Sequence, residues 1–221
     1  MQNIDVKIDA ALLNKANNFS KFRNDCKVYL NKVDKNWDKF TMVDHDSKIG
    51  YLTEKLLSNY FKSKFPKAVI STWEESFDIK KIIEIINNSD YTDNSVELVK
   101  SYFYDHWDLS ITLNNKTIYC DVKTALTKLE PKGTWQFLYP VVQANKPGKD
   151  ISILIYYIVD DIKRIESLKK LCLVGFIKRE NITKLNIIKK GDLTSHATVS
   201  QIDNYITNVK NDYSLDIESL F

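Results

Sequence analysis

The sequence predicts an α/β fold in which a mixed β-sheet is covered by helices. Residues 107–126 alternate polar and apolar side chains on both sides of an Asn-Asn pair, which is typical of a β-hairpin. Residues 151–159 and 171–177 are almost uninterrupted apolar runs rich in β-branched residues, as expected for strands buried on both faces. Residues 49–64 repeat apolar side chains at helical spacing and are expected to cover one face of the sheet.

Length and composition indicate one folded domain. The chain has 221 residues, of which 43% are hydrophobic and 28% charged. The net charge of +3 is too small to indicate a nucleic-acid partner by itself. We expect a cytoplasmic protein without a membrane segment, because we find no apolar run of spanning length and no signal-peptide core. The three widely spaced cysteines include no CxxC pair, which argues against a zinc or iron–sulfur site.

The single domain divides into three expected parts. Residues 1–45 form a helical N-terminal elaboration built on a long helix over 9–37, residues 46–180 form the core, and residues 181–221 form a C-terminal tail. The helix over 49–64 has Asp46 or Ser47 as its expected N-cap. We also predict a helix-like link over 161–170 and a short amphipathic helix in the tail over 202–209.

Between the first core helix and the hairpin, the pattern predicts one strand and two helices. Residues 68–73 are expected to form an outer strand of the sheet. Helices are expected over 79–86 and 96–104, with a polar loop between them.

The hairpin is the part of the chain with a definite register. A two-residue turn at Asn114 and Asn115 pairs Leu113 with Lys116, and successive pairs then follow to Leu109 with Cys120. Asp108 then lies opposite Asp121, and directly opposed residues have Cβ atoms roughly 4.5–5.5 Å apart. Two carboxylates at this distance repel each other unless a divalent cation such as Mg²⁺ lies between them. Lys123 leans from the same face toward the same space.

The acid of Trp107-Asp108 and the D-x-K of Asp121-Val122-Lys123 resemble the active site of the PD-(D/E)xK nuclease superfamily, whose fold is called restriction-endonuclease-like. Trp107 stands where the family often has Pro, at a position that varies widely. The motif is short, and the alternative is a surface hairpin with a polar outer face. The resemblance implies a restriction-endonuclease-like mixed sheet flanked by helices, with residues 46–180 as the catalytic core.

The resemblance also implies the site residues. Many members supply a further acid from a helix before the first active-site strand, and Glu54 matches that acid, although it could be an ordinary glutamate at the helix rim. The implied metal ligands are Asp108, Asp121, the Val122 carbonyl and Glu54, and Lys123 would act on the phosphate. Ligands that are all oxygen favour Mg²⁺ or Mn²⁺.

The leading hypothesis is a metal-dependent endonuclease that cuts double-stranded DNA, most like a type II restriction endonuclease working as a homodimer. Three alternatives stay open: a repair, recombination or phage nuclease of the same fold acting on DNA or RNA, a nucleic-acid-binding protein that lost catalysis, and an interaction protein with an accidental aspartate pair. Phosphate contacts are expected from the basic stretch over 163–190. Base contacts could come from that stretch, from the loops after the hairpin or from residues 78–104.

Overall fold

The structure is a computed structural model that describes residues 1–39, 44–195 and 198–221. Its strands are β1 (Gln2–Ile4), β2 (Val69–Thr72), β3 (Leu109–Leu113), β4 (Lys116–Thr127), β5 (Gln136–Pro140), β6 (Ile151–Val159), β7 (Leu168–Lys178), β8 (Ile187–Ile188) and β9 (Asn204–Asn208). Its α-helices are α1 (Ala10–Val33), α2 (Asp44–Lys64), α3 (Ile79–Asn87), α4 (Asp93–Phe103), α5 (Val141–Ala144) and α6 (Arg179–Ile182). Short 3-10 helices are η1 (Lys35–Lys39), η2 (Trp73–Ser76), η3 (Ile165–Ser167) and η4 (Ile217–Leu220).

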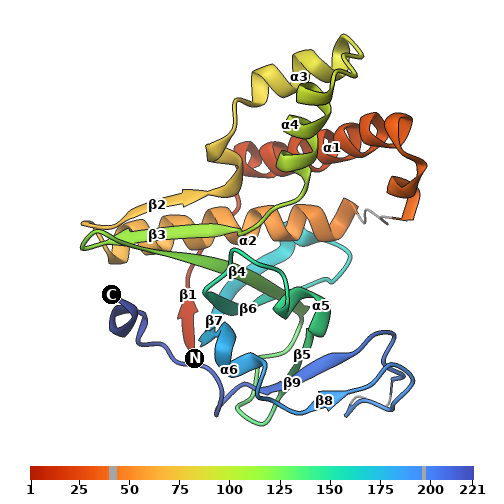
Figure 1. Cartoon of the computed structure of the whole chain (residues 1–221). Helices are drawn as coiled ribbons and strands as arrows, with labels where there is room; N and C mark the ends of the chain where they lie inside the picture. Colours follow the sequence, from red (N-terminus) through yellow and green to blue (C-terminus); the bar gives the residue numbers. More distant parts are fainter. Residues whose placement is uncertain (40–43, 196–197) are drawn as a thin grey trace.

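A six-stranded mixed sheet forms the centre of the molecule, in the order β1-β7-β6-β4-β3-β2 (Figure 1). Strands β2, β3 and β4 pair antiparallel in succession, and β6 then returns parallel to β4. All residues of β6 are buried, as expected for an apolar strand with a neighbour on each side. The predicted α/β class and the outer position of β2 are therefore confirmed.

Helix α2 covers one face of this sheet (Figure 1). Its apolar stripe, which includes Leu52, Leu57 and Phe61, belongs to the same core as Ile111 and Ile155 of the sheet. Because side chains alternate along a strand, the neighbours of Ile155 point to the opposite face, where they meet Trp135, Phe137 and Tyr213. On that side a small sheet in the order β5-β9-β8 packs below the main one.

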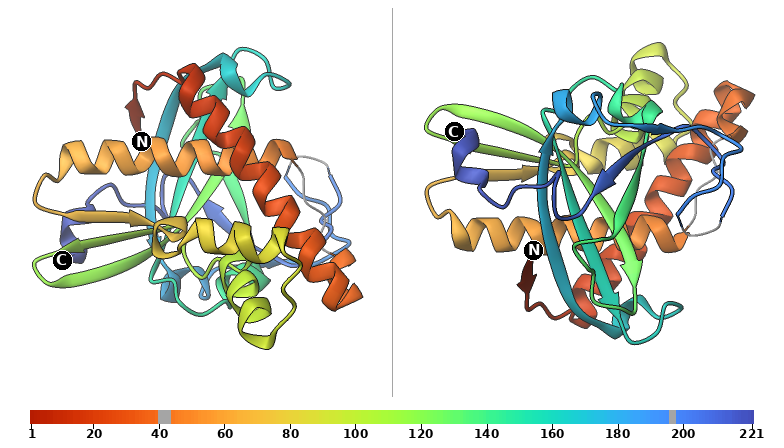
Figure 2. Two further views of the ribbon diagram at one scale, coloured as in Figure 1. Left: turned by 90° about the horizontal axis from the view of Figure 1, so that it is seen from above. Right: turned by 90° about the horizontal axis from the view of Figure 1, so that it is seen from below.

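A separate helical unit lies beyond α2. Helix α1 crosses over α2 and packs against α3 and α4, as Figure 2 shows from above. The core of the unit contains Leu30, Ile82, Val99 and Tyr102. The helical elaboration therefore extends beyond the expected residues 1–45 and includes the helices that precede the hairpin. Within 1–45, β1 lies apart from this unit and pairs with β7 at the sheet edge.

Two expected helices are absent from the described chain. Residues 161–170 form a turn with η3 and the start of β7, because β6 and β7 pair antiparallel and need only a short connection. Residues 204–208 form strand β9, which exchanges backbone hydrogen bonds with β5 and β8. In both places strand pairing overrides the apolar spacing that predicted a helix.

The main core helix begins earlier than expected. Helix α2 starts at Asp44, so Asp46 and Ser47 lie inside its first turns and neither is the N-cap. Cys26, Cys120 and Cys172 are buried free thiols. Among the helices that the structure describes, none combines the length and the apolar content needed to cross a membrane.

Gly175 marks a close approach between β7 and the C-terminal segment. It lies at an irregularity of the β6–β7 pairing, with φ +140°, and a Cβ there would collide with the backbone carbonyl of Ser214. We predict that Gly175→Ala lowers the free energy of unfolding by about 1–3 kcal/mol through overpacking, measured by urea denaturation. Gly191→Ala is the control, because Gly191 also has positive φ but has open space around it. Equal losses in the two variants would show that the collision contributes nothing.

Candidate functional site

The hairpin of β3 and β4 has the predicted register. The structure pairs Leu113 with Lys116 and Leu109 with Cys120, with the intervening pairs in order. Asn114 and Asn115 have φ values of 51° and 61°, the left-handed backbone that a two-residue turn needs. The apolar side chains of this hairpin face α2, so its polar side chains gather on the other face.

Asp108 lies one position before β3, where the regular pairing ends. Its amide donates to the carbonyl of Cys120 at 2.9 Å. One carboxylate oxygen, Oδ2, accepts a hydrogen bond from the amide of Val122 at 2.5 Å. The Asp108 side chain is therefore fixed beside residues 120–122 and is only 8% exposed.

Asp121 is the most enclosed charged group of the site. Lys123 Nζ lies 3.0 Å from its Oδ1 and 2.9 Å from its Oδ2. The Tyr139 hydroxyl donates to Oδ2 at 2.6 Å, and the ammonium of Lys149 contacts Oδ1. Two lysines and a tyrosine from three parts of the chain therefore surround one carboxylate that is 1% exposed.

The charges of this group set its ionisation. Burial opposes the ionisation of Asp121, but Lys123 and Lys149 more than offset it and lower the pKa of Asp121 to about 2. Burial likewise opposes the charged form of Lys149, but Asp108 and Asp121 hold the Lys149 pKa above its ordinary value. Asp121 and Lys149 are thus a buried ion pair at neutral pH.

The pKa values of Asp108 and Glu54 are shifted in the direction opposite to that of Asp121. Burial, followed by the nearby charge of Asp121, raises the pKa of Asp108 to about 7. Burial, followed by Asp108, also raises the pKa of Glu54. The two carboxyls line one cleft of about 210 Å³ between α2 and the start of β3. Glu54 therefore lies on the side of Asp108 that opens to this cleft, and Asp121 does not belong to the cleft lining.

The walls of the cleft come from the helical unit and from aromatic residues. Arg23 of α1 donates to the Phe103 carbonyl at 2.9 Å and lies 3.7 Å from Asp105. Trp73 and Trp107 pack edge to face, with their ring centroids 5.2 Å apart. Arg23, Trp73 and Trp107 all line the cleft. The helical elaboration thus forms one side of the cleft that holds Glu54 and Asp108.

The donor set fits a hard divalent cation. Asp108 and Asp121 are neighbouring carboxylates, and the charge of Asp121 is the second cause, after burial, of the raised Asp108 pKa. In 1–39, 44–195 and 198–221, three or more His, Cys, Asp or Glu side chains do not meet in a metal-binding cluster. Magnesium nevertheless needs only one or two protein carboxylates, since it keeps several waters. Lys149 would have to share or release Asp121 when the ion binds.

The sequence interpretation named four of these side chains and missed two. Lys123 contacts Asp121, and Glu54 lines the same cleft as Asp108. The amide of Val122 holds Asp108 beside the D-x-K strand. Neither Lys149 nor Tyr139 belongs to the site that the sequence predicts. Lys149 precedes β6 by two residues, so parallel pairing of that strand with the D-x-K strand was the signal that could have placed it beside Asp121.

The basic stretch over 163–190 does not form one patch beside the site. Its middle part runs along β7, where Lys170 pairs with the end of β6 and Lys178 with its beginning. Within it, Lys169 contacts Asp160 at 2.6 Å and Lys170 contacts Glu130 at 2.6 Å. Of the lysines on β7, Lys178 lies nearest to Asp121 along the sheet, because Asp121 pairs with Ser152 and Ser152 pairs with Ile177.

Comparisons of the chain with protein-family models, with curated proteins and with solved structures gave no match.

Removal of Lys149 tests the buried ion pair. Lys149→Met leaves Asp121 with Lys123 and Tyr139 only, and we expect the free energy of unfolding to fall by about 1–3 kcal/mol. The control is Lys169→Met, whose exposed pair with Asp160 should contribute less than about 1 kcal/mol. Both are measured by urea denaturation of metal-free protein. Equal effects of the two substitutions would contradict a structural role for the Lys149–Asp121 pair.

The raised pKa of Asp108 predicts a pH dependence. An acid whose pKa is about 7 in the folded protein and 3.8 in the unfolded chain stabilises the fold below about pH 4, and this contribution is lost as the pH rises toward 7. In metal-free protein, Asp108→Asn should remove this pH-dependent loss. In the wild type, the free energy of unfolding falls by at most about 1.4 kcal/mol per pH unit because of Asp108. Denaturation curves at several pH values measure it. Asp5→Asn, an exposed site, should leave the slope as in the wild type, and an unchanged slope in Asp108→Asn would contradict the prediction.

Proposed function

We propose that this chain is a metal-dependent nuclease that hydrolyses phosphodiester bonds, with a site of the PD-(D/E)xK kind. The observation that carries the proposal is the confirmed register of the β3–β4 hairpin, which brings Asp108 beside the Asp121-Val122-Lys123 segment. The position of Glu54 in the same cleft as Asp108 supports it further. A sheet flanked by helices agrees with the fold that this resemblance implies, and we include the restriction-endonuclease-like fold in the proposal.

Each side chain of the site has a separate role in this proposal. Asp108, Asp121 and Glu54 provide carboxylate oxygens, and the Val122 carbonyl is an additional proposed ligand. When bound, Mg²⁺ or Mn²⁺ would polarise the scissile phosphate as a Lewis acid and neutralise the acids. Lys123, whose side chain is 21% exposed, can turn from Asp121 toward a phosphate oxygen and stabilise the charge that develops there. Lys149 is more enclosed and keeps Asp121 ionised and oriented.

The proposed substrate is double-stranded DNA, and the proposed class is a sequence-specific type II restriction endonuclease. A chain of this size with a single site would cut both strands of a symmetric sequence as a homodimer. A repair, recombination or phage nuclease of the same fold uses the same chemistry on DNA or RNA, and the pattern of the products separates these cases.

One observation favours a second candidate, a nucleic-acid-binding protein without catalysis. Both carboxylate oxygens of Asp121 already receive donors from Lys123, Lys149 and Tyr139. Such a fully hydrogen-bonded Asp121 would suit a site in which lysine side chains occupy the place of a metal ion. Calorimetric titration with Mg²⁺ or Mn²⁺ distinguishes the two, because only the nuclease requires a cation to displace a lysine from Asp121.

Cleavage assays test the nuclease. We expect purified protein to cut supercoiled plasmid and long linear DNA with Mg²⁺ and not with EDTA. Asp121→Asn should slow cutting by about 10²-fold or more, since it removes the charge of a proposed metal ligand. Asp5→Asn, an exposed acid, is the matched control and should cut like the wild type. Heat denaturation with and without Mg²⁺ gives a second readout, in which only proteins that bind the ion are stabilised.

The products decide the class. Discrete fragments indicate sequence-specific cutting, and a smear indicates a nuclease without a recognition site. No cutting of DNA or of an RNA control with either metal, together with no calorimetric signal, would overturn the nuclease proposal and leave the binding protein.

A further inference from the structure

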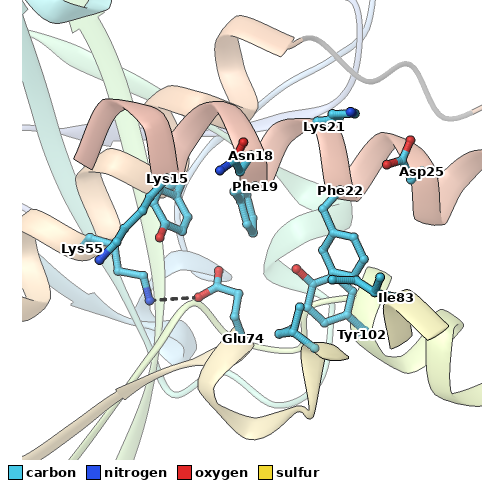
Figure 3. A pocket seen from close by; sticks show the side chains of 12 residues that line it. Lys15, Asn18, Phe19, Lys21, Phe22, Asp25, Lys55, Glu74, Ile83 and Tyr102 are labelled. Atoms are coloured by element: carbon cyan, nitrogen blue, oxygen red, sulfur yellow. Dashed lines mark hydrogen bonds and ion pairs between the residues drawn. The ribbon is translucent and has the colours of Figure 1, made fainter. Parts of the chain in front are cut away.

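A second cavity of about 470 Å³ lies next to the cleft that holds Glu54 and Asp108. It is bounded by α1, α2, η2, α3 and α4, and therefore lies where the helical unit meets the core (Figure 3). Phe19, Tyr51 and Glu74 line both the cavity and the cleft, so the two spaces share a wall. The volume is within the roughly 300–1,000 Å³ typical of ligand sites.

Aromatic rings form two walls of this cavity. Phe19 stacks on Tyr51 with ring centroids 4.6 Å apart, and Phe22 packs on Tyr102 at 5.2 Å. In Figure 3, Phe19 lies on one side of the opening and Phe22 with Tyr102 on the other. The cavity therefore presents aromatic side chains on two sides of its opening. Stacking on aromatic side chains is the usual way in which proteins hold unpaired nucleobases.

A carboxylate lies at the base of the same opening. Glu74 points up between the aromatic walls in Figure 3 and is held by Lys55, whose Nζ lies 3.2 Å from Glu74 Oε2. The other oxygen, Oε1, makes no hydrogen bond to the residues that the structure describes. A carboxylate oxygen accepts hydrogen bonds from amino groups on base edges, as those of cytosine do. The Glu74 carboxylate at the bottom of the cavity therefore suits a nucleobase that carries an amino group.

The charges around the opening suit a phosphate backbone. Lys15 and Lys21 are exposed residues of α1 that belong to the lining at its rim, and Asp25 is the one other acid of the lining besides Glu74. Since Lys55 compensates Glu74, the rim has a net positive charge. Lysines at the edge and aromatic rings inside are the combination found in channels for single-stranded nucleic acid.

We propose that this pocket takes an unpaired nucleobase of the nucleic acid, one that is single-stranded or turned out of the duplex, while the adjoining cleft receives the phosphate next to it. The position of the phosphate rests on the proposed nuclease function, whereas the base pocket stands on its own lining. The substrate class that follows is nucleic acid with an extruded or unpaired nucleotide at the site.

Binding without cleavage tests this inference. A fluorescein-labelled single-stranded DNA of about 20 nucleotides, longer than the ~4–16 that one single-strand module covers, and its perfect duplex are titrated with protein in EDTA. Fluorescence anisotropy gives the affinity. Ile83→Glu places a charge at the pocket lining on a side chain that is 41% exposed, so the fold should tolerate it. Val28→Glu makes the same change at a 49% exposed position outside the lining.

We expect the wild type to bind the single strand more tightly than the duplex. Ile83→Glu should weaken single-strand binding by about fivefold or more, the loss expected when one stacked base is expelled, and Val28→Glu should bind like the wild type. Lys21→Glu should weaken binding as well, with the exposed Lys32→Glu as its control. Circular dichroism checks that each variant is folded.

The outcomes separate this inference from the nuclease proposal. If Ile83→Glu and Lys21→Glu bind the single strand like the wild type, the proposal that the cavity takes a nucleobase is wrong, even if Asp121→Asn had abolished cutting. Weakened binding in these two variants supports the pocket even if no cutting occurs. Equal losses in the pocket variants and in their controls would overturn it, because the effect would then be one of general charge.

Discussion

The candidate site depends on how a single buried carboxylate, that of Asp121, is kept ionised. The D-x-K strand β4 contributes the acid and Lys123, strand β5 contributes Tyr139, and the turn before β6 contributes Lys149. A carboxylate that is 1% exposed would cost several kcal/mol without such partners. The parallel crossover from β4 to β6 places those partners, so the topology of the sheet and the chemistry of the site are specified together.

The hairpin could be predicted from the sequence because it is local. Two asparagines set the turn, and the alternation of apolar residues fixes which face is buried, so the register down to Leu109 and Cys120 follows from period-2 patterning. The exact position of Asp108 does not follow, because its amide bonds to Cys120 and leaves the regular ladder. The proximity of the two aspartates was predictable, whereas the hydrogen bond from the Val122 amide to the Asp108 carboxylate was not.

Lys149 and the C-terminal strand show the limit of local patterns. Lys149 is separated from Asp121 by 28 positions, and only the return of the chain through β5 brings the two together. Residues 204–208 have an apolar spacing compatible with a helix, and β5 and β8 decide in favour of a strand by accepting and donating its backbone hydrogen bonds. In each case the deciding partner lies far away in the sequence, where periodicity carries no information.

The helical unit gives the site its second wall and changes what the cleft can accept. Arg23 of α1 ties this unit to the segment before Asp108, through the Phe103 carbonyl and Asp105. Arg23 and Phe19 of α1 line the cleft that holds Glu54 and Asp108, and burial raises the pKa of both acids. The same helix supplies Phe19, which stands between the acid cleft and the aromatic cavity. The helical unit therefore lines the cleft that holds the acids and also forms an aromatic surface beside it. Because Phe19, Tyr51 and Glu74 belong to both spaces, a ligand in the cavity would contact side chains that also bound the acid cleft.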